Sequence, residues 1–153
     1  MPPPSASAAL HLIVLPSRLF IYKLPITSKL PASLVDSLIA PVAPNIPVFT
    51  SITRTGEELS IVTDVQILPT EFDVKPEGID IPWRALKVQG PMEHSLTGIL
   101  NALSEPLKAA KIPIFAISTW NTDYVLITDD NASAAVEALK SDGWTFVPER
   151  AIV

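Results

Sequence analysis

The spacing of apolar residues between positions 83 and 147 constrains the fold of this chain more than any other feature. Residues Trp83–Gln89 alternate between apolar and polar, which is typical of a half-buried strand. A stretch with apolar residues at helical spacing follows, then two short apolar runs, a second helical stretch and a last apolar run. We therefore predict a helix from Ser95 to Leu107, strands over 114–119 and 124–128, a helix that begins after Asp130 or Asn131 and ends at Gly143, and a strand over 144–147.

Few folds are compatible with this β-α-β-β-α-β order. Two right-handed crossovers produce a four-stranded antiparallel sheet with both helices on one face. We expect an α+β fold of the ferredoxin-like βαββαβ type. Because this scaffold serves many functions, the pattern alone does not specify an activity.

The first half of the chain reads β-β-α-β-β and is not a clean copy of the second. We predict strands over 10–15 and 19–24 with a turn at Ser17-Arg18, a short helix over 33–40, and a hairpin of strands 48–54 and 59–64. These elements suffice for a second unit that is incomplete or permuted. The predicted organisation is a flexible tail (1–8), an N-terminal unit (9–68), a linker (69–82) and a C-terminal unit (83–153).

Charge and composition exclude several functional classes. The net charge is −5, and the 11 basic residues are scattered among 16 acidic ones, so we expect no nucleic-acid partner. No apolar run reaches the length of about 18 residues that a membrane span needs, so we expect no membrane partner. The apolar run from Ala8 to Leu15 has prolines before it instead of a basic region, which argues against a signal peptide. We expect a cytoplasmic protein.

The chain also lacks the constellations that catalysis and metal binding require. It has no cysteine, and its two histidines are His11 and His94. His94 beside Glu93 is too small a ligand set for a metal. A triad of His94, Asp123 and a serine can be written on paper, but no nucleophile elbow or glycine-rich phosphate loop accompanies it. We expect no cofactor, no metal and no enzymatic activity, with a small enzyme kept as the third alternative.

Two motifs carry a resemblance to a known family. The strand at 83–89 and Gly90-Pro91 are followed by Leu96-Thr97-Gly98-Ile99, and further on by the segment Ser118-Thr119-Trp120-Asn121-Thr122-Asp123-Tyr124. Together, in this order, they resemble the tandem ACT-domain proteins of bacteria and fungi and the ACT domains of the CASTOR arginine sensors. The resemblance covers about residues 10–147 and implies tandem ACT units, the second complete, with a ligand bound where units meet.

The resemblance also implies which residues bind the ligand. In the sensors the pocket uses the loop before the helix that here includes Gly98, and the segment that matches 119–123. An acidic residue of the sensors, two positions before that glycine, is replaced here by Leu96, which removes a partner for a guanidinium group. Carried over by position, one wall consists of Glu93, His94, Ser95, Thr97 and Gly98, the other of Thr119, Trp120 and Asp123, and the facing unit contributes Ser60 and Ile61.

The residue types suit an amino-acid ligand, although each has a structural alternative. The first turn of a helix has unpaired amides that favour a carboxylate, and Asp123 can pair with an ammonium or guanidinium group. Trp120 could cover the ligand or stack on a cation. As alternatives, Gly98 could serve only close packing of the helix on the sheet, Asp123 could be a turn residue, and Trp120 could be a packed aromatic.

Two functional hypotheses follow. The first is a regulatory module that binds a small molecule, an amino acid, and acts through a homodimer or a separate regulatory partner. The second is an interaction or scaffold protein that keeps the fold without the ligand, which the replacement at Leu96 favours. The exposed edges of a sheet would support pairing with a second chain in either case.

Overall fold

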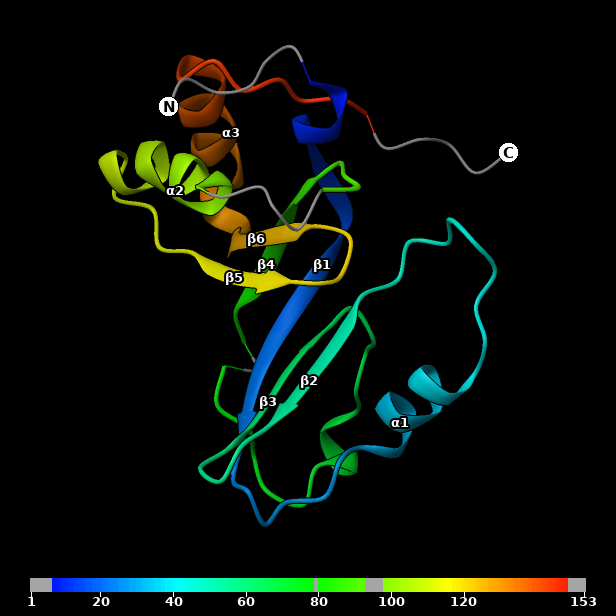
Figure 1. Cartoon of the computed structure of the whole chain (residues 1–153). Coiled ribbons are helices and arrows are strands. Elements are labelled where there is room, and N and C mark those ends of the chain that lie inside the picture. The colour runs from blue at the N-terminus through cyan, green and yellow to red at the C-terminus, as the bar shows by residue number, and fades with distance from the viewer. Residues whose placement is uncertain (1–6, 79, 93–97, 149–153) are drawn as a thin grey trace. The chain divides into compact units, whose positions relative to one another are not determined.

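The structure, a computed structural model, describes residues 7–78, 80–92 and 98–148. The chain forms two compact units (Figure 1). Unit 1 combines the described residues up to Pro16 with those from Arg84 onward, and unit 2 comprises Ser17–Trp83. The predicted boundaries differ in two places, since residues 9–16 pack with the C-terminal unit and the predicted linker 69–82 belongs to unit 2.

Unit 1 contains the β-α-β-β-α part of the predicted pattern. In chain order its elements are β4 (Pro82–Val88), of which Pro82 and Trp83 belong to unit 2, α2 (Ile99–Ala109), β5 (Phe115–Ser118), β6 (Asp123–Thr128) and α3 (Ala132–Ser141). The strands follow the order β4-β6-β5, with β5 and β6 antiparallel. Short 3-10 turns occupy Ala8–Leu10 and Asp129–Asn131.

Both helices of unit 1 pack on the same face of the strands, as predicted. Leu103 and Leu107 of α2 and Leu139 of α3 join one apolar core with Leu86 of β4 and Val125 of β6. Gly143 ends the second helix as predicted, with a φ of 99° and its amide bonded to the Lys140 carbonyl at 3.0 Å. The fold is therefore of the predicted α+β, ferredoxin-like class.

The closing strand of unit 1 comes from the start of the chain. Strand β1 (Leu12–Leu24) begins in unit 1, where it neighbours β4. The Leu12 amide donates to the Thr145 carbonyl, and the Val147 amide donates to the Leu12 carbonyl, both at 2.8 Å. The predicted last strand is thus present only as a parallel bridge between Leu12 and Phe146.

Two sequence predictions are wrong in this region. The turn predicted at Ser17-Arg18 does not exist, because β1 runs through both residues without interruption. Neither has the positive φ that a tight hairpin turn demands. The predicted cap of α3 is also absent, since the Asn131 side chain donates to the Thr128 hydroxyl at 3.0 Å instead of capping the helix.

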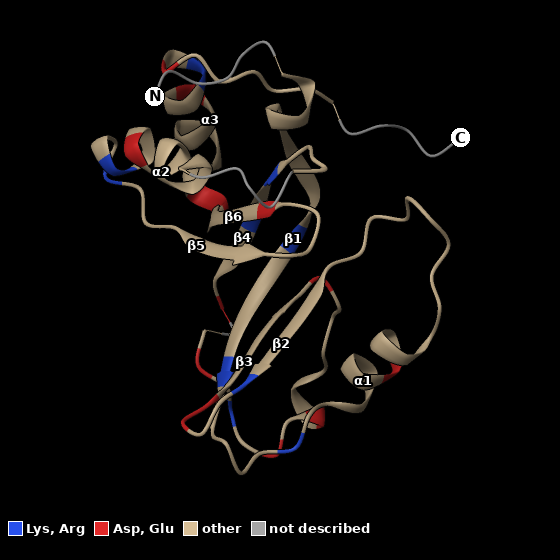
Figure 2. Ribbon diagram, in the orientation of Figure 1, with Lys and Arg blue, Asp and Glu red and all other residues tan. Residues whose placement is uncertain are grey.

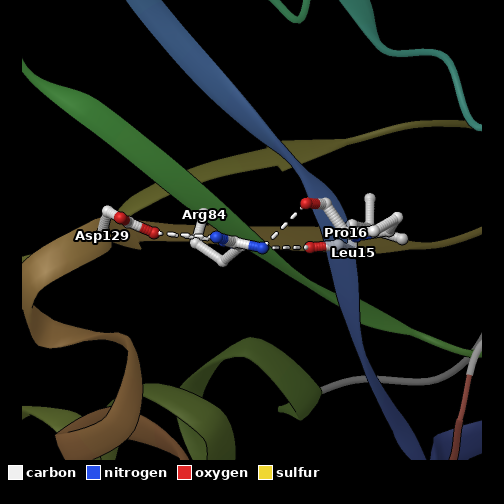
Figure 3. Close-up of polar contacts among 4 residues, drawn as sticks. All are labelled: Leu15, Pro16, Arg84 and Asp129. Carbon is white, nitrogen blue, oxygen red and sulfur yellow. Dashed lines mark hydrogen bonds and ion pairs between the residues drawn. The ribbon is translucent and has the colours of Figure 1, made fainter.

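Arg84 connects three parts of unit 1 (Figure 3). Its guanidinium donates to the carbonyls of Pro16 at 2.8 Å and Leu15 at 3.4 Å. Its Nε and Nη2 donate to Asp129 Oδ1 at 3.2 and 3.0 Å. Both side chains are mostly buried, so the ion pair fixes the end of β6 against the middle of β1.

Unit 2 is a smaller assembly with its own core. The later part of β1 pairs antiparallel with β3 (Leu59–Thr63), and β3 pairs antiparallel with β2 (Thr50–Arg54). The predicted hairpin of β2 and β3 is confirmed. Helix α1 (Ala32–Ile39) inserts Leu34 into a core with Tyr22, Leu24, Leu59 and Ile61. A 3-10 turn at Pro69–Glu71 is the one short helical turn predicted for the linker.

Candidate functional site

The turn between β5 and β6 has a closely bonded backbone. The Thr119 amide donates to the Thr122 carbonyl at 2.8 Å, and the Thr119 hydroxyl donates to the same carbonyl at 3.2 Å. The Thr122 amide reaches the Thr119 hydroxyl at 3.4 Å. These bonds define a four-residue turn that presents Trp120 and Asn121 at its tip.

Three contacts join this turn to the segment that follows β4. The buried Thr122 hydroxyl donates to the Val88 carbonyl at 2.6 Å, and the Met92 amide donates to the Asn121 carbonyl at 2.8 Å. Between them lies Gly90, with a φ of 65°. A Cβ atom there would lie 3.1 Å from Thr122 Cβ and 3.2 Å from the Asn121 carbonyl oxygen, so only glycine allows this approach.

The contacts place the turn beside the residues that lead into the predicted first wall. That wall was predicted over Glu93–Gly98, and Met92 directly precedes it. Glu93, His94, Ser95 and Thr97 lie outside the described residues, as does Leu96. Within the described part, residues 88–92 therefore contact the turn at 118–123, and Gly98 is the remaining described residue of the predicted wall.

Gly98 is required by the backbone and not by packing. It precedes the first residue of α2 with a φ of 78°, in the left-handed region that favours glycine. Among the described residues, no atom lies within 4 Å of the place that a Cβ atom would take at this position. The described part of the sheet therefore gives no support to the alternative that Gly98 permits close packing of α2. The residue instead lets the chain enter the helix, whose first-turn amides lack intrahelical partners.

Asp123 is held by its cross-strand neighbour. Its Oδ1 accepts a hydrogen bond from the Ser118 hydroxyl at 2.5 Å, and the two residues are register partners in β5 and β6. The carboxylate is thus oriented by another strand, and not by its own turn backbone as the alternative held. It is half-buried, which leaves part of the carboxylate accessible.

Trp120 and Thr119 lie at the surface. The Trp120 side chain is 81% exposed, so it is not the packed aromatic of the structural alternative. Burial raises the pKa of the Tyr124 hydroxyl above its ordinary value. Asp123 and Tyr124 are successive residues of β6, so their side chains point to opposite faces of the strand. The turn therefore presents an exposed indole, followed by the oriented carboxylate of Asp123.

The two residues predicted in the facing unit lie on β3 of unit 2. Ile61 is fully buried in the core of that unit, and its side chain packs with Tyr22 and Leu59. Ser60 is half-buried, in register with Lys23 on β1 and Thr53 on β2. Ile61 therefore presents no exposed surface to a ligand in this structure.

Sequence reasoning missed the residues that hold the site together. Thr122 and Gly90 carry no obvious chemistry, and neither was selected as a candidate. The Gly90-Pro91 dipeptide was the available signal, because such pairs mark turns with unusual backbone conformations. The described residues contain no group of three or more carboxylates or histidines that could bind a metal. No described helix is long and apolar enough to cross a membrane.

Comparison with known proteins identifies the domain around this site. Residues 79–141 match the family model of the ACT domain. Over these residues the chain is similar to the ACT domain. This match spans β4, α2, β5, β6 and α3, so it covers the described site completely. ACT domains are regulatory modules that bind amino acids, and the predicted resemblance to this family is confirmed.

A known amino-acid sensor is similar over part of this domain. The human and bovine proteins named cytosolic arginine sensor for mTORC1 subunit 1 are 34% identical over 59 residues. The matched stretch is 38% of this chain but only 18% of the sensor. The chain thus resembles about one domain of a much longer protein.

Solved structures extend the likeness to both units. A crystal structure of an Agrobacterium tumefaciens protein is 28% identical, with a TM-score of 0.69 over 94% of this chain and 96% of that one. A structure of aspartokinase alpha and beta subunits covers 86% of this chain at 18% identity and a TM-score of 0.58. The second likeness concerns the fold alone.

Proposed function

We propose that this chain is a regulatory module that binds a free amino acid at the ACT-domain site and catalyses no reaction. The observation that carries this proposal is the junction of Gly90 and Met92 with the turn at Asn121-Thr122. It supports the proposal because the predicted wall Glu93–Gly98 directly follows Met92 and Asp123 directly follows the turn. The proposed cellular compartment is the cytoplasm.

The arrangement supplies a partner for each part of an amino acid. Unpaired amides at the start of α2 favour the carboxylate of the ligand. Asp123, already oriented by Ser118, suits an ammonium or guanidinium group. The exposed ring of Trp120 can cover an apolar side chain or stack on a cation. These complementary groups support an amino-acid ligand without specifying which one.

Ligand-dependent stabilisation tests this function. We would follow thermal unfolding of the purified chain against each of the twenty amino acids. A ligand at a hundred times its dissociation constant adds about 2.7 kcal/mol, which raises the midpoint by several degrees in a chain of this size. A selective rise supports the sensor, and no rise for any amino acid contradicts it.

The Asp123→Ala variant tests whether the ligand binds at the proposed site. This variant should lose the ligand-dependent rise in midpoint, whereas its own folding should change little. Asp142→Ala is the matched control, because Asp142 is exposed at the end of α3, away from the site residues. A full response in the Asp123→Ala protein would contradict the assignment of the site.

The second candidate is an interaction protein that has the ACT fold but no ligand. Leu96 at the position of an acidic residue in the sensors favours it. In both cases we propose that a homodimer or a regulatory partner completes the module. Strands β2 and β5 each have one hydrogen-bonded neighbour, so both present an edge for pairing. Light scattering with and without amino acids would measure the oligomeric state.

A further inference from the structure

The segment between α1 and β2 of unit 2 is long, apolar and exposed. Every residue from Leu38 to Val48 is exposed, including Ile39 at 74% and Val48 at 58%. No charged residue occurs from Ser37 to Thr53. Figure 2 accordingly shows the whole connection between α1 and β2 in tan. Apolar side chains so exposed in an uncharged connection indicate a surface for recognition.

Prolines recur in this segment at every third position. Pro41, Pro44 and Pro47 are separated by two residues each, within the sequence Ala-Pro-Val-Ala-Pro-Asn-Ile-Pro-Val. A polyproline II helix has three residues per turn, so Pro41 and Pro44 lie on the same edge of such a helix. Ala40, with φ −69° and ψ 130°, enters the segment close to this conformation.

The segment is attached at both ends and only weakly bonded between them. The Ala40 amide bonds to the Asp36 carbonyl of α1, and the Phe49 amide bonds to Asp64 Oδ2 at 3.2 Å. Inside the segment, the Ile46 amide donates a backbone hydrogen bond to the Ala43 carbonyl at 3.4 Å, and this bond closes a turn in which Asn45 has a φ of 65°. This turn separates the arm Ala40–Pro44 from the residues that follow.

We propose that Ala40–Pro44 is a docking segment for a partner protein with an aromatic-lined groove that binds polyproline II helices. Such grooves accept paired prolines at this spacing, and the fixed φ of proline lowers the entropy lost on binding. Because the arm has no charge, its affinity should depend little on salt. Missing amides at the prolines also disfavour pairing as a strand.

A second copy of the chain is a poorer occupant. Among the described residues, aromatic pairs in contact include Phe20 with Tyr22 and Tyr22 with Phe72, at 6.2 and 5.5 Å between ring centroids. All three pack in or against the core of unit 2. These rings are occupied with the fold, so they do not offer an aromatic groove to another copy.

The test is a titration of the isotope-labelled full chain with purified SH3, WW and EVH1 domains, followed by NMR. We expect chemical-shift changes confined to the amides of residues 40–48 with at least one domain. The Pro41→Ala/Pro44→Ala variant should bind about tenfold or more weakly, as expected when central contacts are truncated. Pro113→Ala, at an exposed proline of unit 1, should bind normally.

Three results would overturn the proposal. One is that no domain of the three classes changes the spectrum. Another is that the changes persist in the double variant while its thermal midpoint matches that of the wild type. The last is that the same amides shift with protein concentration alone, which would assign the segment to self-association.

Discussion

The hydroxyl of Thr122 donates a 2.6 Å hydrogen bond to the carbonyl of Val88, and both residues are buried. The bond links the β5–β6 turn to the end of β4, and the Met92 amide adds a second bond across the same junction, to the Asn121 carbonyl at 2.8 Å. The Thr122 hydroxyl is the side-chain contribution to this junction.

Thr122→Val preserves the side-chain shape and removes this hydroxyl. We expect a loss of about 1–3 kcal/mol in the free energy of unfolding, because the buried Val88 carbonyl loses its partner. Denaturant unfolding would measure it. Thr53→Val, at an exposed position of β2, is the control and should change stability by less than about 0.5 kcal/mol. Equal stability of the two variants would contradict the importance of the junction.

Gly98→Ala tests the backbone explanation for this glycine. We expect a cost of about 1–2 kcal/mol, since an L-residue is strained at a φ of 78°. Gly98→Asn should cost less, because asparagine tolerates the left-handed region. Gly56→Ala is the control, as Gly56 has no positive φ and no atom near its missing Cβ. If alanine and asparagine at 98 are both as stable as glycine in urea unfolding, the explanation fails.

Arg84→Lys tests the ion pair with Asp129. A lysine cannot reproduce the fork that reaches Asp129 and two carbonyls together, so we expect a loss of about 1–3 kcal/mol. Arg54→Lys serves as the control, because Arg54 is exposed and its guanidinium donates a long hydrogen bond of 3.5 Å to the Ile26 carbonyl. Comparable unfolding free energies for both variants would show that the fork contributes nothing.

Asp64 should make stability depend on pH. Burial raises the pKa of this carboxyl, and the hydrogen bonds from the Phe49 and Asp64 amides only partly offset that effect. The unfolded chain then releases the Asp64 proton at lower pH than the folded one. Its contribution to stability therefore falls as pH rises from the ordinary aspartate range through the folded-state pKa.

Asp64→Asn removes this titration and can still accept the Phe49 amide. We expect the variant to gain stability relative to the wild type as pH rises across that window, measured by urea unfolding at pH 3 to 7. Asp36→Asn, at an exposed position of α1, is the control. A difference between Asp64→Asn and the wild type that is constant over this range would contradict the prediction.

Local patterns in the sequence predicted most of unit 1. The stripe of Ile99, Leu103 and Leu107 on α2 forms part of the core, and Gly143 ends α3 with the expected left-handed backbone. These features depend on spacing within one element, which a single sequence displays. The ACT resemblance selected the turn at 118–123 for the proposed site from a contiguous stretch of the sequence.

Such local patterns do not predict contacts between segments that are far apart in the sequence. Nothing local to Pro16 indicates that Arg84, 68 positions later, donates to its carbonyl, and without this contact a proline followed by Ser17-Arg18 reads as a turn. For the same reason the sequence did not indicate that the strand from the start of the chain, β1, closes unit 1. An apolar run at 10–15 is typical of a strand, but its hydrophobicity does not identify its neighbours.

The strand that closes unit 1 has a consequence for biosynthesis. Residues around Leu12 leave the ribosome before Gln89, which bonds to His11, and long before Thr145 and Val147, which bond to Leu12. Leu10 and Leu12 therefore lack these partners until the segment around Thr145 has been translated. Translation speed and chaperone access in that interval should govern the yield of folded protein.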